Sequence, residues 1–340
     1  MVWICPTCGR ACKTLRDLKI HHKIKHKTSL PQDYLQDVTE AEASNGIKIL
    51  PVDPEVFIPK NVPKYVPTNS EFEIFEAHLE SGVPLLLIGP KGIGKTLSFA
   101  AFAAQKGVPI IQFDCSENVK RGDLIGRFLL RGDEVVYQLG VIPTAFEVAN
   151  KKGAAILVFE ELNALTPQMQ KVLNQALDWR RHCFIPELNK VYRLKPGVKL
   201  LIAATMNPST YGGVHELNED LLSRFAVWYW NYPGKDLEKR IITEVALRNG
   251  FNEIPGEILD GILRLAKETR ASVAAGDVEY ALSPRDIVQF CQLYIAYSKY
   301  FSGKSLLKKA LETSVLGKYE DEDHRKFVKQ RIESVFGVRI

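Results

Sequence analysis

The sequence has no apolar run long enough to span a membrane. Its longest runs, such as residues 84–88 and 154–159, are far shorter than the roughly 20 residues that a spanning helix needs. The first residues also lack the apolar stretch of a signal peptide, because cysteines and basic residues stand in its place. The missing apolar stretches argue against a membrane protein or a membrane partner, and we expect a cytoplasmic protein. Internal repeats and low-complexity tracts are absent too.

Cysteine is scarce, with six in 340 residues. Three of them cluster near the N-terminus, whereas a disulfide framework would need a denser set in a smaller chain. We expect the scattered ones to be small buried residues in a reducing compartment. These scattered cysteines are Cys115, Cys183 and Cys291.

The net charge of +5 is distributed unevenly. Residues 1–28 hold seven basic side chains and one acid, a local charge of +6, so the rest of the chain sums to −1. The hydrophobic fraction of 46% and the charged fraction of 25% are those of an ordinary globular protein with two or three domains. The positive charge therefore belongs to the N-terminal module alone.

Composition and periodicity divide the chain into four parts. Residues 1–28 are basic and rich in Cys and His, and residues 29–66 form a proline-spaced linker that we expect to be extended. From residue 67 to 232, short apolar runs alternate with helical stretches, which predicts an α/β fold with three αβα layers around a parallel sheet. Residues 233–340 carry only helical patterns, and we expect an all-α lid there.

Five apolar runs and two insertions make up the predicted α/β core. The runs are expected strands at residues 85–88, 110–113, 155–159, 199–204 and 227–229. Residues 127–137 and 184–194 each have the pattern of a β-hairpin. Each hairpin could pack on the core or face a substrate.

Residues 89–96, GPKGIGKT, fit the P-loop pattern G-x-x-x-x-G-K-[ST]. An apolar run leads into the loop and a helix-prone stretch leaves it, which is the context that phosphate binding requires. Lys95 is expected to reach the β- and γ-phosphates of ATP, and the hydroxyl of Thr96 to bind Mg²⁺. The residues predicted to contact the nucleotide are Gly89, Pro90, Lys91, Gly92, Ile93, Gly94, Lys95, Thr96 and Leu97.

Two neighbouring strands end in polar residues that suit hydrolysis. The run 155–159 leads into Glu160 and Glu161, and the run 199–204 leads into Asn207. The carboxyl ends of parallel strands are where such sheets bind ligands. We expect Glu160 to hold magnesium-bound water, Glu161 to polarise the attacking water, and Asn207 to orient it.

These motifs resemble those of the AAA+ ATPases, and most of all the MoxR and dynein-related branch with midasin and the CbbQ/NorQ activators. Residues 112–126 resemble that branch's segment after the second strand, and residues 159–163, FEELN, its Walker B motif. Residues 204–208, ATMNP, match sensor 1, and 221–225, LLSRF, match the arginine-finger box. Residues 283–285, SPR, resemble sensor 2. The resemblance covers roughly residues 67–300.

The resemblance implies a role for each matching residue. Glu161 would be the catalytic base, Asn207 sensor 1, and Arg285 the sensor 2 arginine near the γ-phosphate. Arg224 would reach the nucleotide of a neighbouring subunit, which implies a ring, most often a hexamer. One departure matters: Glu160 stands where the family normally has aspartate, so its longer side chain must adjust and turnover could be slow.

Near the N-terminus, Cys5-x2-Cys8-x12-His21-x4-His26 has the spacing of a C2H2 zinc finger. Two thiolates on a hairpin and two imidazoles one helical turn apart could close a tetrahedron around Zn²⁺, giving a ββα module. His22 is an alternative to His21, and Cys12 stands where such fingers usually carry an aromatic residue. Residues 1–28 could dock on a protein or bind nucleic acid through phosphates.

Together these patterns predict a ring-forming AAA+ ATPase that remodels a macromolecular complex and is recruited through the finger to a protein client. A nucleic-acid translocase, helicase-like or packaging ATPase that binds DNA through the finger is the alternative. A nucleotide-gated scaffold with little turnover is a third, suggested only by Glu160.

Overall fold

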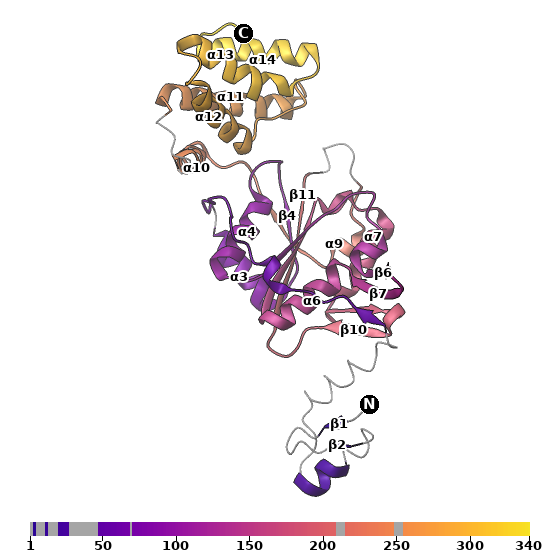
Figure 1. Cartoon of the computed structure of the whole chain (residues 1–340). Helices are drawn as coiled ribbons and strands as arrows, with labels where there is room; N and C mark the ends of the chain where they lie inside the picture. The colour runs from indigo at the N-terminus through magenta and orange to yellow at the C-terminus, as the bar shows by residue number, and fades with distance from the viewer. Residues whose placement is uncertain are drawn as a thin grey trace.

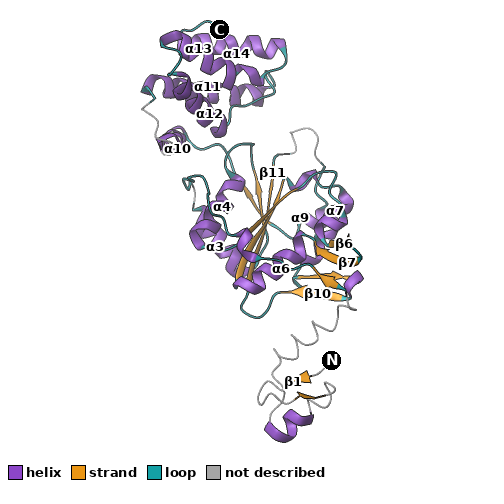
Figure 2. Cartoon of the chain, viewed as in Figure 1, coloured by secondary structure: helices purple, strands orange, loops and turns teal. Residues whose placement is uncertain are grey.

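The computed structural model describes residues 3–4, 11–12, 20–26, 47–68, 70–208, 215–247 and 254–340. Within these ranges, none of the helices combines the length and the apolarity that crossing a membrane demands. The described part of the chain builds an α/β core followed by a helical region (Figures 1 and 2).

A five-stranded sheet with the order β12-β4-β11-β8-β5 lies at the centre of the core. All neighbouring strands in it are parallel. The predicted apolar runs are its strands: β4 (Leu85–Ile88), β5 (Ile110–Asp114), β8 (Ala154–Glu160), β11 (Lys199–Met206) and β12 (Ala226–Tyr229). Parallel strands place their carboxyl ends at one edge, so the polar residues that follow β4, β8 and β11 meet there.

Helices cover both faces of this sheet, as Figure 1 shows. Along β4, Leu85 and Leu87 face α3 (Glu71–Ser81) and α4 (Lys95–Lys106), where they pack with phenylalanines of both helices. Leu86 and Ile88 point the other way and pack with α6 (Val141–Lys152). The shorter helices on that side are α7 (Pro167–Val172), α8 (Asn174–Leu177) and α9 (Glu219–Leu222). The predicted αβα layering follows from this alternation, because the central strands β4, β8 and β11 are apolar and largely buried on both faces.

Both predicted hairpins are present. After α5 (Arg121–Leu124), β6 (Gly126–Arg131) pairs antiparallel with β7 (Glu134–Leu139), and the short strand β3 (Lys48–Ile49) adds to β7 in parallel. The second hairpin joins β9 (His182–Ile185) to β10 (Lys190–Arg193) through the turn η4 (Pro186–Leu188). Three apolar side chains on the first hairpin are exposed: Phe128, Leu130 and Val135.

The proline-spaced segment lies on the core over its described residues. It contains β3 and a single 3-10 turn, η2 (Pro54–Phe57). Lys151 of α6 donates a 2.8 Å hydrogen bond to the carbonyl of Val52, and Lys152 forms an ion pair with Glu55. Residues 63–68 then reach the carboxyl edge of the sheet.

Five helices form the C-terminal region around a hydrophobic core of their own. They are α10 (Lys235–Leu247), α11 (Gly256–Ala275), α12 (Pro284–Tyr297), α13 (Gly303–Ser314) and α14 (Glu322–Phe336), with the turn η5 (Leu316–Lys318) before the last. Arg270 of α11 donates to both oxygens of Glu238 on α10, at 2.9 and 2.6 Å, and its guanidinium lies 4.0 Å from the ring centroid of Tyr232. This buried pair fixes the first lid helix beside the chain that leaves the sheet.

Candidate active site

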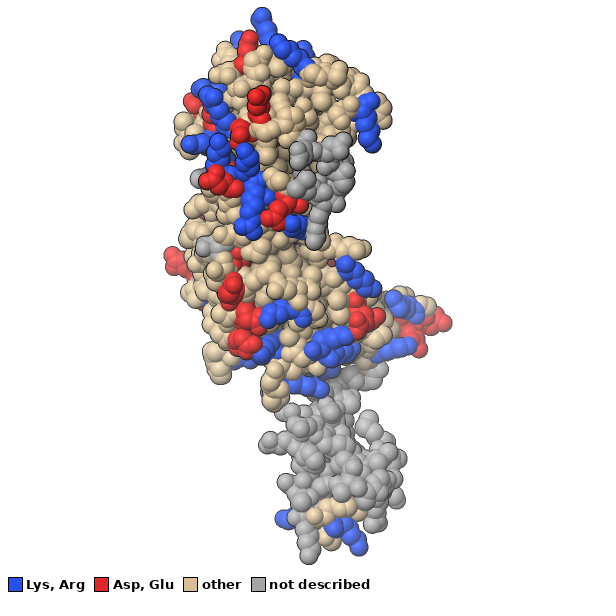
Figure 3. Space-filling view, turned by 90° about the vertical axis from the view of Figure 1, so that its left-hand side faces the viewer, with Lys and Arg blue, Asp and Glu red and all other residues tan. Residues whose placement is uncertain are grey.

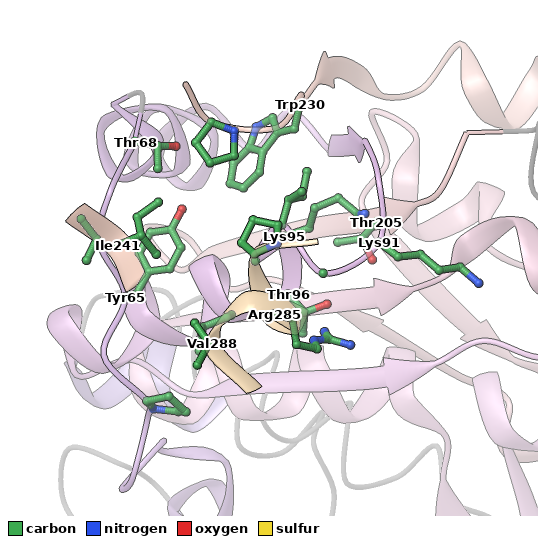
Figure 4. Close-up of a pocket in the computed structure, with 18 of the residues that line it drawn as sticks. Tyr65, Thr68, Lys91, Lys95, Thr96, Thr205, Trp230, Ile241, Arg285 and Val288 are labelled. Carbon is green, nitrogen blue, oxygen red and sulfur yellow. The ribbon is translucent and has the colours of Figure 1, made fainter. Parts of the chain in front are cut away.

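The loop after β4 turns tightly before α4 begins at Lys95 (Figure 4). Gly92 and Gly94 adopt φ angles of +72° and +94°, which residues with a side chain rarely adopt. A Cβ on Gly92 would also overlap the hydroxyl of Ser283 from the lid. The first backbone N–H groups of α4 have no partner within the helix, so the loop and the helix terminus together can bind phosphate.

The ammonium of Lys95 lies inside this loop. It donates to the carbonyls of Gly89 and Pro90, at 2.7 and 2.8 Å, and to Oδ1 of Asn207 at 3.2 Å. Burial lowers the pKa of Lys95 to about 8, against the opposing attraction of Glu161. Lys95 is therefore the cation that the loop holds closest to the expected phosphate position.

Glu160, at the end of β8, reaches across to the loop. Its Oε2 accepts a 2.9 Å hydrogen bond from the hydroxyl of Thr96, and its Oε1 accepts one of 3.1 Å from Gln112 on β5. Burial raises the pKa of this carboxyl, and Asp114 adds to the effect, while the bond from Thr96 opposes it. A hydroxyl and a carboxylate are oxygen donors of the kind Mg²⁺ prefers, so Thr96 and Glu160 fit such an ion.

Glu161 is held in an unusual backbone conformation. Its φ is +52°, in the left-handed region that costs a non-glycine residue of order 1 kcal/mol or more. Its N–H lies 3.4 Å from the hydroxyl of Thr205 on β11. This turn away from the direction of β8 separates the side chain of Glu161 from that of Glu160, so that the two carboxylates have different neighbours.

The side-chain amide of Asn207 joins two of the predicted residues. Its Oδ1 accepts from Lys95 at 3.2 Å, and its Nδ2 donates to Oε1 of Glu161 at 3.4 Å. The buried Asn163, in the turn η3 (Leu162–Ala164), donates to the backbone carbonyl of Asn207 at 3.4 Å. One amide thus connects the phosphate-binding lysine to the carboxylate expected to act on water.

Arg285 enters the site from the first turn of lid helix α12. Its N–H donates to the carbonyl of Gly92 at 3.3 Å, and its charge helps to lower the pKa of Lys95, whose main cause is burial. Ser283 and Asp286 form a capping box at the start of this helix, and Lys318 forms an ion pair with Asp286. The helix that carries Arg285 is therefore fixed directly against the phosphate loop (Figure 4).

These groups surround a cavity of about 920 Å³ between the sheet edge and the lid. One end of this cavity is apolar, and its lining residues were not predicted from the sequence. Tyr65 stacks on Phe72, with ring centroids 5.8 Å apart, and donates a 2.9 Å hydrogen bond to Glu71. This end is lined by Tyr65, Val66, Trp230, Ile241, Val245 and Val288. Its size and its chemistry suit a flat nucleotide base.

Arg224 does not line this cavity. It precedes β12, while the cavity lies at the far end of that strand, beside Tyr229 and Trp230. Its guanidinium donates a 3.0 Å hydrogen bond to Asp220, four residues earlier in the chain. Six of the predicted polar site residues thus converge on one edge of the sheet, whereas Arg224 lies at the opposite edge. The converging residues are Lys95, Thr96, Glu160, Glu161, Asn207 and Arg285.

At the N-terminus, β1 (Trp3–Ile4) pairs antiparallel with β2 (Ala11–Cys12), and a helical turn follows at His22–His26. The ring centroids of His21 and His26 lie 5.3 Å apart. Cys5 and Cys8 lie outside the described residues, and the described ones contain no group of three or more potential metal ligands. Zinc binding stays a prediction.

Comparison with known proteins adds independent information. Residues 84–225 match the model of the AAA domain (dynein-related subfamily). Protein NorQ of Paracoccus denitrificans (strain Pd 1222) is 29% identical over 233 residues, which cover 68% of this chain and 81% of NorQ. Protein CbbQ of Hydrogenophilus thermoluteolus is 27% identical over 186 residues, 55% of this chain and 67% of CbbQ. An uncharacterized protein of Staphylococcus aureus (strain USA300) is 26% identical over 272 residues, 79% of this chain and 97% of that protein.

Proposed function

We propose that this chain, in which residues 84–225 form an AAA domain of the dynein-related subfamily, is an ATP hydrolase that works as a ring of several copies. The observation that carries the proposal is the amide of Asn207, which contacts both Lys95 and Glu161. The cation must bind the γ-phosphate while the carboxylate acts on the water that attacks it, so the two groups must lie close together, and this contact supports that arrangement.

Hydrolysis would proceed from the groups already in place. Phosphate oxygens would replace the two loop carbonyls as partners of Lys95, and Arg285 would approach the γ-phosphate from the lid. Glu161 would accept a proton from water as the water oxygen bonds to the γ-phosphorus. The bond from that phosphorus to the bridging oxygen then breaks, and ADP leaves with the electron pair. Bound Mg²⁺, held by Thr96 and Glu160, would supply positive charge beside the phosphates.

The position of Arg224 supports a ring. An arginine that stabilises the transition state must lie close to the γ-phosphate, yet Arg224 is at the opposite edge of its own sheet. Only a second copy could bring it to a nucleotide. A head-to-tail contact of this kind closes into a ring when the rotation between copies allows it. We propose a hexamer, the number that the resemblance implies.

The work of the ring is proposed to be the remodelling of a macromolecular complex, with a protein as the client. The hairpin β6–β7 supports this part, because Leu130 and Val135 on it are 74% and 56% exposed. Exposed apolar side chains on a projecting hairpin suit transient contact with a protein segment. Recruitment is proposed to occur through residues 1–28, with Zn²⁺ held by Cys5, Cys8, His21 and His26; the spacing and the 5.3 Å between the two imidazoles support this ligand set.

A nucleic-acid translocase is the second candidate, and the local charge of +6 in residues 1–28 favours it. The core and the lid add little to this case. On the face shown in Figure 3, basic and acidic side chains are interspersed over both, without the continuous basic track that a phosphate backbone requires. This face therefore offers no support for a nucleic-acid contact on the core or the lid.

Two substitutions test the ATPase assignment. Lys95→Ala should abolish nucleotide binding, whereas Glu161→Gln should bind ATP and release no phosphate, since Lys95 acts on bound phosphate and Glu161 on water. Nucleotide affinity and phosphate release are the measurements. Lys106→Ala, which removes an exposed lysine from the other end of α4, is the control and should match the unmodified chain. If Lys95→Ala binds and hydrolyses ATP normally, the site is assigned wrongly.

A further inference from the structure

Trp179 has the most exposed large apolar side chain among the described residues, at 90%. It lies just after α8, in the turn that leads to the hairpin β9–β10. An indole buries roughly 150–250 Å² when it is covered, so leaving one in water forgoes a large gain. Such side chains are enriched at the centres of protein interfaces.

The turn that carries Trp179 is held firmly on both sides of it. The carboxylate of Asp178 accepts from the N–H and Nε of Arg180, at 2.9 and 2.8 Å. Arg181 adopts a φ of +46°, and its guanidinium donates to the carbonyls of Gly82 and Leu200. The indole is thus presented from a fixed backbone, which lowers the entropy cost of covering it.

These contacts also locate Trp179 on the core. Gly82 and Leu200 lie at the amino ends of β4 and β11, so the turn is at the sheet edge opposite the nucleotide cavity. Arg224 is at this edge as well. Asp220 links the two regions, because it accepts from Asn174 of α8 at 2.6 Å and from Arg224 at 3.0 Å. Trp179 and Arg224 therefore share one surface.

We propose that Trp179 anchors one copy of this chain to the nucleotide-side edge of the next copy, and so places Arg224 at the neighbour's triphosphate. The inference rests on the proposed ATPase function. The partner is a second copy of this chain, because Trp179 shares its surface with Arg224, and Arg224 does not line the nucleotide cavity of its own subunit. Charge supports it too: Arg180 and Arg224 would approach the edge where Asp114 at the end of β5 lies beside Glu160 at the end of β8, with Glu161 following.

The test measures assembly of the full chain with ATP, in the Glu161→Gln background so that nucleotide persists. Trp179→Ala should raise the protein concentration at half-assembly at least ten-fold by sedimentation velocity, and Trp179→Phe should raise it less because an aromatic ring remains. Leu130→Ala, which truncates another exposed apolar side chain, should leave the midpoint unchanged. ATP affinity measured below the assembly range should be the same in all variants.

Several outcomes would overturn the inference. An unchanged midpoint in Trp179→Ala would assign Trp179 to some other partner. An equal shift in Leu130→Ala would show that the loss of any exposed apolar side chain weakens assembly, and would remove the anchor role of Trp179. A chain that hydrolyses ATP but stays monomeric at every concentration would also overturn it, and would leave the ATPase proposal standing. If the unmodified chain neither binds nor hydrolyses ATP, it is the proposed function that fails. Thermal unfolding of each variant shows whether the fold is kept, as the exposure of Trp179 leads us to expect.

Discussion

The hydroxyl of Thr96 donates directly to the carboxylate of Glu160, over 2.9 Å. The AAA+ ATPases that this chain resembles normally carry aspartate at this position. Because glutamate is one methylene longer, its oxygen reaches the hydroxyl without an intervening ligand. A magnesium ion held by both groups must therefore separate them first, at the expense of this hydrogen bond.

Glu160→Asp should consequently lower the Mg²⁺ concentration that gives half-maximal ATP hydrolysis, by about ten-fold if one hydrogen bond to a charged group, worth roughly 1.5 kcal/mol, no longer has to break. Glu160→Gln should raise that concentration at least about ten-fold, since a charged oxygen donor is lost. Steady-state phosphate release against Mg²⁺, at saturating ATP, measures both. If Glu160→Asp needs more Mg²⁺ than the unmodified chain, the longer side chain of Glu160 favours binding of the ion rather than opposing it.

Lys95 gives the site a pH dependence. Burial lowers its pKa to about 8, so above pH 8 the free protein increasingly carries a neutral amine in the loop. The neutral amine attracts phosphate less, and the affinity for ATP should fall as pH rises from about 8, approaching ten-fold per pH unit. Equilibrium binding of a fluorescent ATP analogue between pH 7 and 9.5 measures this. Lys95→Arg stays charged throughout and should bind with a flat profile, even if more weakly.

The same pKa shift predicts the opposite trend for stability. The unfolded chain keeps its Lys95 proton up to about pH 10.5, whereas the folded one releases it near pH 8. Between these values the unfolded state binds more protons, so this residue makes the free energy of unfolding rise with pH. Denaturant unfolding of the unmodified chain, compared with Lys95→Met, isolates the contribution. A contribution of Lys95 that falls over this range would contradict a lowered pKa.

Much of the core could be predicted because its signals are local. The strands of the parallel sheet are short and bounded by turn residues, and the three central ones are apolar on both faces. The P-loop spacing is set by the glycines that the turn requires. The hairpins, too, are encoded by their own residues. Helix α14 lies within the all-α lid expected over residues 233–340, although it is mostly polar and only Val328 and Ile332 on it are buried.

The rest of the site depends on contacts between distant segments. Nothing local distinguishes Tyr65 or Ile241, which line the cavity, from ordinary core residues. The bond from Asn207 to Glu161 could be expected from strand order, but the left-handed backbone of Glu161 could not. Trp179 illustrates the same limit, because its turn is held by Arg181, which binds the carbonyl of Gly82 at the end of α3 and that of Leu200 on β11.

Mixing subunits should expose the role of Arg224. Alone, Arg224→Ala should bind ATP normally and hydrolyse it at least about a hundred-fold more slowly, because charge in the transition state is left uncompensated. Mixed with Glu161→Gln, it should regain part of the activity wherever an intact Glu161 meets an intact Arg224 across an interface. Phosphate release against mixing ratio is the measurement. Wild-type turnover by Arg224→Ala alone, or the absence of any rescue, would exclude a trans arginine.

Residues 1–28 should bind nucleic acid mainly through phosphates, if they bind it at all. The positions of a finger helix that usually reach bases are Thr14, Arg16, Asp17 and Ile20, and only Arg16 is a strong donor to a base edge. Affinity for double- or single-stranded DNA should therefore fall steeply with salt and depend little on sequence. Fluorescence anisotropy of labelled oligonucleotides at several salt concentrations measures both.

Deleting residues 1–28 should remove this binding and leave basal ATP hydrolysis unchanged, since the described core and lid pack without them. Chelating zinc should have the same effect as the deletion, because so small a module has too little core to fold without its metal.

Exchange of His21 or His22 for alanine then distinguishes the two candidate ligands, because only the loss of the true ligand should weaken zinc binding. DNA binding that survives both deletion and chelation would place the contact in the hairpins β6–β7 and β9–β10. Absence of binding at physiological salt would favour a finger that docks on protein, because a ring with several fingers has the avidity to reveal even weak phosphate contacts.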